Sequence, residues 1–353
     1  MGLVRLASMT LLGAALVAPL AAGTPPPLCS AAGADLTHHW AGEGTAEDGV
    51  GAADGTVSGA GYVAGRIGSA FNFDGVDDQI SFGSSVGNFG TDDFTVTYWI
   101  RTTGTAHAGV FGKRPSCFHD SFLDNRMTAD GRLGVEIDQD PAATNYNSLA
   151  TTATVNDGGF HFFAFVREGN TLRTWVDGVA DTSGATTGVT NISNASNLIA
   201  GRGACTGVDG TAYFSGQLDE IKIYDRALSL CEVLAGVDAG LDFDLDGAVL
   251  PLTDMLLLLR RLFGFSGSVL TTGVVGNGCV RCGAEPLVVF IDAVKSALDV
   301  DGGGTVEPLT DGILFLRYAF GFRGTALIAG AVGQPCTRCD APAVEGFLDP
   351  LFP

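Results

Sequence analysis

The sequence has few basic residues and, beyond its N-terminal segment, lacks a long apolar run. Lysine and arginine together number 19 against 39 aspartates and glutamates, which gives the 353 residues a formal net charge of −20. A field of that sign repels phosphates, so nucleic acids and anionic membranes are not expected as partners. A membrane-spanning helix needs ~18 or more consecutive apolar residues, and no segment after the N-terminus has them. We therefore expect no membrane insertion by the mature chain.

Long helical patterns are also scarce before Cys231, where short β-like runs alternate with turns rich in Gly, Asp and Asn. Glu168-Gly169-Asn170 is predicted to form a hairpin turn between two of these runs. Many strands with short turns within ~200 residues predict a mainly β fold, an antiparallel sandwich or jelly roll. In FTVTYWI, the period of two places Phe94, Val96, Tyr98 and Ile100 on one face of a strand, and Thr95, Thr97 and Trp99 on the other.

Residues 1–23 have the pattern of a secretory signal peptide. One Arg precedes a run of small and apolar residues, and Ala21-Ala22-Gly23 offers a small-residue cleavage site before a proline cluster. An uncleaved anchor is the alternative, but the run is short and wrongly flanked for one. We expect a secreted, extracellular protein, either free or associated with a cell surface.

The eight cysteines agree with export, because disulfides form and persist in oxidising compartments. Two C-x-R-C segments favour a local disulfide in each, although two such pairs could also complete a four-cysteine zinc site. A thioredoxin-like redox role is less favoured, since no βαβ pattern surrounds the pairs. The predicted disulfides are Cys279–Cys282, Cys336–Cys339 and, by elimination, Cys29–Cys231 and Cys117–Cys205.

The segment from Leu241 to Pro353 is a tandem repeat with a period of 57 residues. PLTD recurs at 251 and 308, FGF at 263 and 320, and C-x-R-C at 279 and 336. A repeat this faithful indicates one supersecondary unit used twice, here over 241–297 and 298–353. Each unit is predicted to contain an acidic loop, an apolar helix, a Gly-rich connector, a cysteine pair and a second helix. The first helix is expected to start near Pro251 and to end near Phe263.

Each unit opens with an acidic loop that is typical of a calcium site. Ca²⁺ takes about six to eight oxygen ligands, which an EF-hand loop supplies from fixed positions ending in an acid at position 12. In LDFDLDGAVLPLTD and LDVDGGGTVEPLTD the last acid falls one residue late, and the second loop has Gly303 at position 5 and fewer carboxylates. The predicted ligands are Asp242, Asp244, Asp246, Ala248 through its carbonyl, Asp254, Asp299, Asp301, Thr305, Glu307 and Asp311.

Three motifs in the first region carry a family resemblance. FNFDGVDDQISF, FAFVREGNTLRTWVDGV and GQLDEIKIYDRALS occur in that order. Together they resemble the laminin-G-like jelly roll of the concanavalin A-like lectin/glucanase superfamily. The resemblance implies a jelly roll over residues 29–232 and a role in recognising glycans or other polymers.

The acidic loops, each followed by an arginine-bearing helix, resemble the calcium-binding repeats of dockerins. That resemblance implies two calcium ions, a small α-helical C-terminal module and a role in attachment or assembly through a cohesin-like protein. The loop length of 13 and the added cysteine segment depart from the dockerin pattern, and this departure concerns cohesin binding more than calcium binding.

One acidic strand raises the alternative of catalysis. Alternation in VEIDQD is predicted to place Glu136, Asp138 and Asp140 on one face of a strand. Glucanases of the same superfamily carry E-x-D-x-E on a strand. Retaining hydrolysis needs two carboxyls about 5–5.5 Å apart, and here the third acid is the shorter Asp, with Pro141 directly after it. We therefore predict a non-catalytic protein, with a polysaccharide hydrolase as the alternative.

Sugar binding would need exposed aromatic side chains that stack on the apolar faces of the rings. Four candidates are expected in or near loops: Trp40, Phe118, His119 and Tyr146. The overall prediction is a secreted modular protein whose jelly roll binds glycan or another extracellular polymer and whose calcium-stabilised repeats attach or assemble it. A purely structural surface protein without a ligand is a further alternative.

Overall fold

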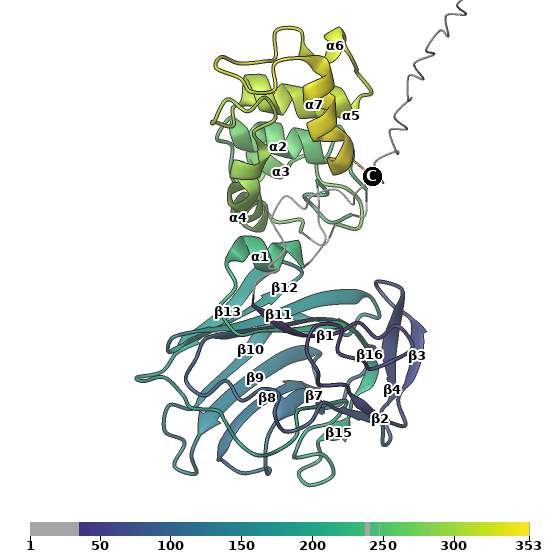
Figure 1. Cartoon of the computed structure of the whole chain (residues 1–353), viewed down its shortest axis with the longest axis vertical. Coiled ribbons are helices and arrows are strands. Elements are labelled where there is room, and N and C mark those ends of the chain that lie inside the picture. The colour runs from purple at the N-terminus through teal and green to yellow at the C-terminus, as the bar shows by residue number, and fades with distance from the viewer. Residues whose placement is uncertain (1–34, 237–240, 247, 280, 353) are drawn as a thin grey trace, which may run out of the picture.

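The computed structural model describes residues 35–236, 241–246, 248–279 and 281–352. The predicted signal peptide and Cys29 lie outside the described residues, as does the side chain of Cys231, so the predicted Cys29–Cys231 disulfide lies outside them too. Figure 1 shows a β sandwich with a helical module stacked on one side of it. The mainly β fold class with a small C-terminal helical part is therefore as predicted.

In the described part of the chain, the sandwich consists of two eight-stranded sheets. Sheet A has the order β13-β12-β11-β6-β16-β4-β3, with β1 also pairing with β16, and sheet B has the order β10-β9-β8-β7-β14-β5-β2, with β15 pairing with β7. The strands of sheet A are β1 (Leu36–Trp40), β3 (Gly61–Ala64), β4 (Ser69–Asp74), β6 (Phe94–Arg101), β11 (Phe160–Glu168), β12 (Thr171–Val176), β13 (Val179–Ala185) and β16 (Ser215–Tyr224). Those of sheet B are β2 (Thr56–Ser58), β5 (Gln79–Ser81), β7 (Ala108–Lys113), β8 (Ser121–Met127), β9 (Arg132–Gln139), β10 (Asn147–Thr154), β14 (Ile199–Ala200) and β15 (Ala212–Tyr213).

Alternation along β6 sorts its side chains between two cores. Phe94, Val96, Tyr98 and Ile100 pack into the core between the sheets, while Trp99 faces outward, which confirms the predicted faces. The side chains of β11, which pairs with β6, alternate between the two cores in the same way. Glu168 of β11 pairs with Thr171 of β12, which leaves a two-residue turn at the predicted hairpin.

The helical module contains two copies of the repeat. Its helical segments, together with α1 (Leu230–Ala235) that precedes them, are α2 (Asp254–Leu262), α3 (Ser268–Thr271), α4 (Ala284–Val294), η1 (Lys295–Leu298), η2 (Pro308–Gly312), α5 (Ile313–Ala319), α6 (Thr325–Ile328), α7 (Ala341–Leu348) and η3 (Asp349–Leu351). Among the residues that the structure describes, no helix has both the length and the apolar character to cross a membrane.

The first helix of repeat 1 begins at Asp254, three residues later than predicted from Pro251. The reason is a wide turn at this point of both repeats. The Met255 N–H donates to the Leu250 carbonyl (3.3 Å), and the Gly312 N–H donates to the Glu307 carbonyl (3.1 Å). Each bond spans five residues instead of the four of an α-helix. The wide turn takes up one extra residue, which accounts for the late Asp at position 13 of each loop.

A continuous apolar core joins the module to the sandwich. Trp99, Phe162, Val166 and Trp175 on the outer face of sheet A belong to the same buried cluster as the inner faces of α2, α4 and α5. In Figure 1 the module lies on the side of β11, β12 and β13, with β8 and β9 on the far side of the sandwich. The module therefore packs on the part of the outer face of sheet A that contains these four residues.

Candidate functional site

A row of polar side chains crosses the outer face of sheet B. The register pairs Asp124 of β8 with Glu136 of β9, and Glu136 with Ser148 of β10. Their neighbours Leu123 and Val135 point into the core between the sheets. Because side chains alternate along a strand, the three polar residues share the opposite face.

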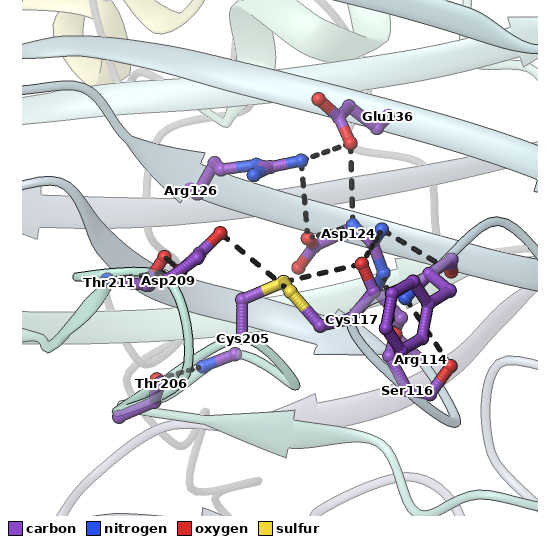
Figure 2. Close-up of a disulfide and its surroundings, with 12 residues drawn as sticks. Arg114, Ser116, Cys117, Asp124, Arg126, Glu136, Cys205, Thr206, Asp209 and Thr211 are labelled. Atoms are coloured by element: carbon purple, nitrogen blue, oxygen red, sulfur yellow. Dashed lines mark hydrogen bonds and ion pairs between the residues drawn. A yellow bond between two sulfur atoms is a disulfide. The ribbon is translucent and has the colours of Figure 1, made fainter.

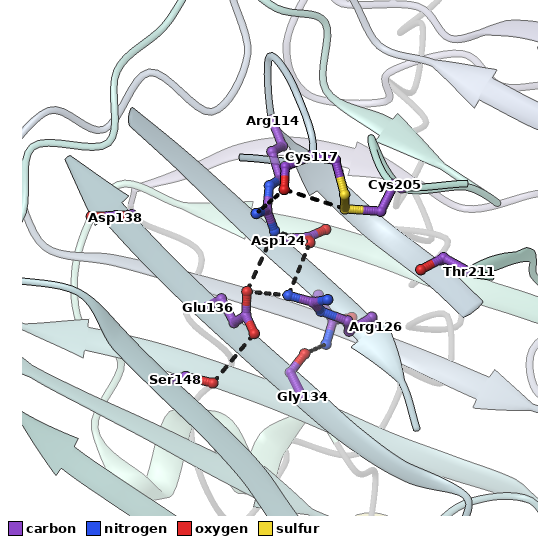
Figure 3. A network of polar contacts seen from close by, with 12 residues as sticks. Arg114, Cys117, Asp124, Arg126, Gly134, Glu136, Asp138, Ser148, Cys205 and Thr211 are labelled. Carbon is purple, nitrogen blue, oxygen red and sulfur yellow. Dashed lines mark hydrogen bonds and ion pairs between the residues drawn. A yellow bond between two sulfur atoms is a disulfide. The ribbon is translucent and has the colours of Figure 1, made fainter. Parts of the chain in front are cut away.

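Two arginines neutralise the two carboxylates of this row. Arg114 Nη1 lies 2.8 Å from Asp124 Oδ2 and 3.4 Å from Glu136 Oε2, and Arg126 contacts the same two groups. Ser148 Oγ lies 3.4 Å from Glu136 Oε1, as Figure 3 shows. Burial raises the pKa of Asp124, although both arginines act in the opposite direction. The network thus carries two charges of each sign, held in place by one another.

The acidic triplet on β9 does not form the arrangement expected for catalysis. Glu136 is engaged by the two arginines, and Asp138 is fully buried with its Oδ2 2.5 Å from His119 Nδ1. The prediction that Asp140 shares their face was wrong, because β9 ends at Gln139 and Asp140 lies in the following turn. There it accepts hydrogen bonds from the Ala142 N–H (2.9 Å) and the Thr144 N–H (3.2 Å). These three acids do not provide two accessible carboxyls on one face.

Three of the four aromatic candidates gather at the edge of this face. Phe118 has 77% of its surface exposed, and the rings of His119 and Tyr146 meet edge to face with centroids 5.0 Å apart. Arg114 links them to the row, because its Nη2 donates to the Cys117 carbonyl (3.3 Å) while Nη1 holds Asp124. We call Phe118, His119 and Tyr146 the aromatic rim.

Trp40 is a correction to the predicted set. It is fully buried, donates its indole N–H to the Ala53 carbonyl (2.9 Å) and packs against Phe82 in the core between the sheets. A Trp near a chain terminus or a turn is therefore not by itself a surface residue. Trp40 takes no part in the candidate site.

The Cys117–Cys205 disulfide anchors the loop that carries Phe118. It joins residues 88 positions apart, and Figure 2 shows it beside Arg114 and Asp124. On the far side of the bridge, Asp209 accepts hydrogen bonds from the Thr211 backbone N–H (3.1 Å) and hydroxyl (2.6 Å). The rim is therefore held on a cross-linked support instead of on a free loop.

Sequence reasoning missed Arg114, Asp124, Arg126 and Ser148. A signal was present in SFLDNRM, where Asp124 and Arg126 are two residues apart and lie between the apolar Leu123 and Met127. The partner of each charge depends on strand register, which a single sequence does not reveal.

The acidic loops of the module bring most of the predicted ligands together. Asp242, Asp244 and Asp246 form one group, and Asp299, Asp301 and Asp311 form another, each with carboxylate oxygens within 4.8 Å of one another. Oxygen donors from several carboxylates at that spacing fit the coordination of Ca²⁺.

The late Asp of each loop is bound to the loop backbone. Asp254 Oδ1 accepts from the Phe243 N–H (2.7 Å), and Oδ2 accepts from the Leu250 N–H (2.9 Å). Asp311 repeats these contacts with Val300 and Glu307. Burial raises the pKa of both carboxyls. Asp311 belongs to the second acidic group, whereas Asp254 does not belong to the first.

The other predicted ligands lie at the outside of the loops. Ala248, which was expected to offer its carbonyl, and Thr305 are both exposed. Glu307 is also exposed, and its carboxylate is not part of the second group. The predicted set therefore contains a tightly clustered part, made of aspartates, and a peripheral part.

Each C-x-R-C segment contains a local disulfide, Cys279–Cys282 in repeat 1 and Cys336–Cys339 in repeat 2. A four-cysteine zinc site would need the same sulfurs as thiolates, so the two arrangements are mutually exclusive.

Comparison with known proteins places the sandwich among familiar folds. A family model described as the concanavalin A-like lectin/glucanases superfamily (Laminin_G_3) matches residues 74–234, which is less than half of the chain. The search of curated proteins found no match. The jelly roll is therefore similar to laminin-G-type domains, as the sequence motifs predicted.

Several solved structures are similar to the chain at low identity. The binding domain of Paraclostridial Mosquitocidal Protein 1 has a TM-score of 0.48 and 16% identity, covering 60% of this chain and 53% of that one. Domain 4 of AbnA, a GH43 extracellular arabinanase from Geobacillus stearothermophilus in complex with arabinotriose, has a TM-score of 0.48 and 18% identity, covering 57% and 97%. The botulinum neurotoxin serotype D binding domain has a TM-score of 0.44 and 12% identity, covering 58% and 51%.

The chain spans about half the length of the toxin domains to which it is similar. At these identities and TM-scores the similarities do not identify a ligand.

Proposed function

We propose that this chain is a secreted, non-catalytic binding protein whose jelly roll holds a glycan or another extracellular polymer against the outer face of sheet B. The observation that carries the proposal is the contrast between the two outer faces. The part of the outer face of sheet A that contains Trp99, Phe162 and Trp175 is apolar and packs against the module, whereas the outer face of sheet B has a charge-paired polar row bordered by the aromatic rim.

The chemistry of this face suits a sugar polymer. An exposed Phe118 can stack on the C–H face of a sugar ring, while Arg126, Glu136 and Ser148 offer donors and acceptors to hydroxyl groups. Because the charged groups already neutralise one another, a neutral polyol meets no unpaired buried charge on binding.

Secretion is supported by the cysteine usage. The structure contains three disulfides among its described residues, and disulfides of this kind persist in oxidising compartments. The outer face of sheet B would then be presented to polymers outside the cell, where the acidic chain stays soluble.

The helical module supports a second role, attachment or assembly, in which calcium stabilises the acidic loops. Phe263 and Phe265 of repeat 1 and Phe320 and Phe322 of repeat 2 are all between 43 and 51% exposed. The same FGF motif is thus exposed twice, at equivalent positions. Repeated apolar residues of this kind suit a protein partner, such as a cohesin-like domain. Calcium would bind through the aspartate groups of the two loops and would perform no chemistry.

A binding screen of the full chain tests the jelly-roll proposal. Immobilised glycans and soluble polysaccharides are offered in calcium and in chelator, and affinity for any hit is measured for F118A and for the matched control F320A. We expect about a tenfold weaker affinity for F118A, because the stacking ring is lost, and wild-type affinity for F320A. Equal affinities for the two variants, or no binding to any polymer, would contradict the proposal.

The hydrolase alternative is tested on the same polymers. Release of reducing ends by the wild type that is abolished in Glu136→Gln would show that the face is catalytic. We expect no release by either protein, because Glu136 is held by two arginines.

A further inference from the structure

Each disulfide-closed C-x-R-C turn places one arginine against the acidic loop of its own repeat. In repeat 1 the backbone N–H of Arg281 donates to the Asp244 carbonyl (2.9 Å), and its Nη1 donates to the Phe243 carbonyl (2.8 Å). The equivalent pair of contacts recurs 57 residues later. The Arg338 N–H donates to the Asp301 carbonyl (2.8 Å) and its Nε to the Val300 carbonyl (2.7 Å).

Each of the two guanidinium groups lies against the face of an aromatic ring. Arg281 lies 3.8 Å from the ring centroid of Phe290, and Arg338 lies 4.5 Å from that of Phe347. Both rings belong to the helix that directly follows the disulfide, α4 or α7. Arg281 is 1% exposed. The turn, the disulfide and the following helix therefore fix where each guanidinium lies.

The connector of each repeat contributes a second brace. The Gly276 N–H donates to Asp244 Oδ2 (2.6 Å), and the Gly333 N–H donates to Asp301 Oδ2 (2.7 Å). The aspartate at position 3 of each loop is therefore oriented through its side chain, while the arginine of the same repeat holds its backbone.

Charge alone does not explain an arginine at this place. A buried positive group beside an acidic loop repels a bound cation, so it lowers cation affinity through Coulomb forces. Its planar fork, however, can hold neighbouring carbonyls in one geometry, which a lysine cannot do. In repeat 2 the fork also reaches the Asp299 carbonyl, and so spans the residues from position 1 to position 3.

We propose that Arg281 and Arg338 are positioning residues of the two acidic loops, which hold the backbone so that the aspartates at positions 1 and 3 converge on one cation. The inference rests on the proposed calcium binding. Arg281 also donates to the carbonyl of Asp177 (3.4 Å), in the turn between β12 and β13, and so connects the first loop to the jelly roll.

Two matched variants of the full chain, R338M and R317M, test the proposal. Arg317 belongs to the same repeat and donates to the carbonyls of Leu327 (2.9 Å) and Ala329 (2.8 Å), away from the loop. Each variant removes one positive charge and its bonds to carbonyls. In calorimetric titration with CaCl₂ we expect R338M to weaken one of the two sites about 10- to 100-fold, as for other residues that orient metal ligands. R317M should keep both dissociation constants within about threefold of the wild type.

Hydrogen exchange in chelator gives a second readout that does not need calcium. The Gly303 N–H and Gly304 N–H donate to the carboxylate of Asp299 (3.0 and 2.8 Å). If Arg338 holds the loop, these two amides exchange about tenfold faster or more in R338M, and at the wild-type rate in R317M.

The outcomes distinguish the positioning role of Arg338 from the proposed calcium binding. Tighter or unchanged calcium binding in R338M, with unchanged exchange, would overturn the positioning role and leave the guanidinium as a charge. A wild type that takes up no calcium would contradict the proposed calcium function, while the exchange comparison still decides the positioning role. If R338M does not fold but R317M does, R338K replaces it. A weakened site in R338K supports the proposal, and wild-type affinity overturns it, because lysine keeps the charge and loses the fork.

Discussion

The two sheets of the sandwich differ most on the faces that point away from each other. Both contribute alternating apolar residues to the core between them, so their inner faces are alike. On the outer face, sheet A has Trp99, Phe162 and Trp175, whereas sheet B has Asp124, Arg126 and Glu136. Three large apolar side chains side by side are stable only when other residues bury them, whereas a charge-paired face can stay in contact with water. The composition of the two outer faces therefore differs where one packs within the chain and where the other is proposed to hold a ligand.

The strongest test of this contrast compares one phenylalanine from each side. Phe162 is 2% exposed between sheet A and the module, and Phe118 is 77% exposed at the edge of sheet B. We expect F162A to lower the free energy of unfolding by about 3–5 kcal/mol, because it leaves a cavity in a shared core. F118A should change it by less than about 0.5 kcal/mol. Urea unfolding of both variants measures the difference. Similar losses would mean that the two faces are not distinct.

The second test concerns how the loops of sheet B are held. Replacing Cys117 and Cys205 with serine should cost about 2–4 kcal/mol, whereas the same change at Cys279 and Cys282 should cost less. The reason is that the entropy removed from the unfolded chain grows with the loop that a bridge closes, and the separations are 88 and 3 residues. The measurement is denaturant unfolding of the oxidised proteins. An equal or larger loss at Cys279 and Cys282 would contradict this account.

A pH test reports on sheet A. Burial by itself would lower the pKa of His161, but hydrogen bonds and the charges of Asp177 and Asp157 raise it to about 9. Since this value exceeds the ordinary 6.5, protonated His161 stabilises the fold fully below pH 6.5, and this contribution is lost as the pH rises from 6.5 to about 9. We expect a decrease of about 1–2 kcal/mol over that window, reduced because the site is partly solvated. The same measurement on H161Q should give a flatter profile, and an identical slope would contradict the assignment.

The smallest expected effect is at the polar row. Ser148 is exposed and its hydroxyl meets Glu136, so S148A should leave the stability of the chain within about 0.5 kcal/mol of the wild type. Loss of one hydroxyl from the proposed binding face should weaken polymer binding about threefold, the effect of one ordinary hydrogen bond. A control at Thr171, on the hairpin edge of sheet A, should leave affinity unchanged. Equal effects of the two changes would place the ligand elsewhere.

Much of the fold could be predicted from local patterns. Alternation in FTVTYWI assigned Phe94 and Trp99 to opposite faces because side chains along a strand alternate regardless of what covers them. The repeat was equally readable, since identical motifs at a constant period imply identical units. The helix start at Pro251 was wrong because a wide turn, supported by the buried Asp254, delays the first α-helical turn of repeat 1.

The candidate site was only partly predictable. The aromatic residues of the rim stood out as single large side chains near loops, yet Trp40 had the same signal and is a core residue. Arg126 was missed because its ion pair with Glu136 depends on the register between β8 and β9. Arg281 and Arg338 were visible within the C-x-R-C motif, but their carbonyl partners lie about 38 residues earlier in the chain.

The sequence by itself determined the jelly-roll class, the duplicated module and the clustering of aspartates in two loops, because each depends on spacing along one segment of chain. Tertiary structure alone decided which outer face the module covers, how the charges of β8 and β9 pair, and where the C-x-R-C arginines lie. The physical reason is that burial and ion pairing depend on which distant segments meet. Strand register and the docking of the module set those meetings, and no single segment encodes either one.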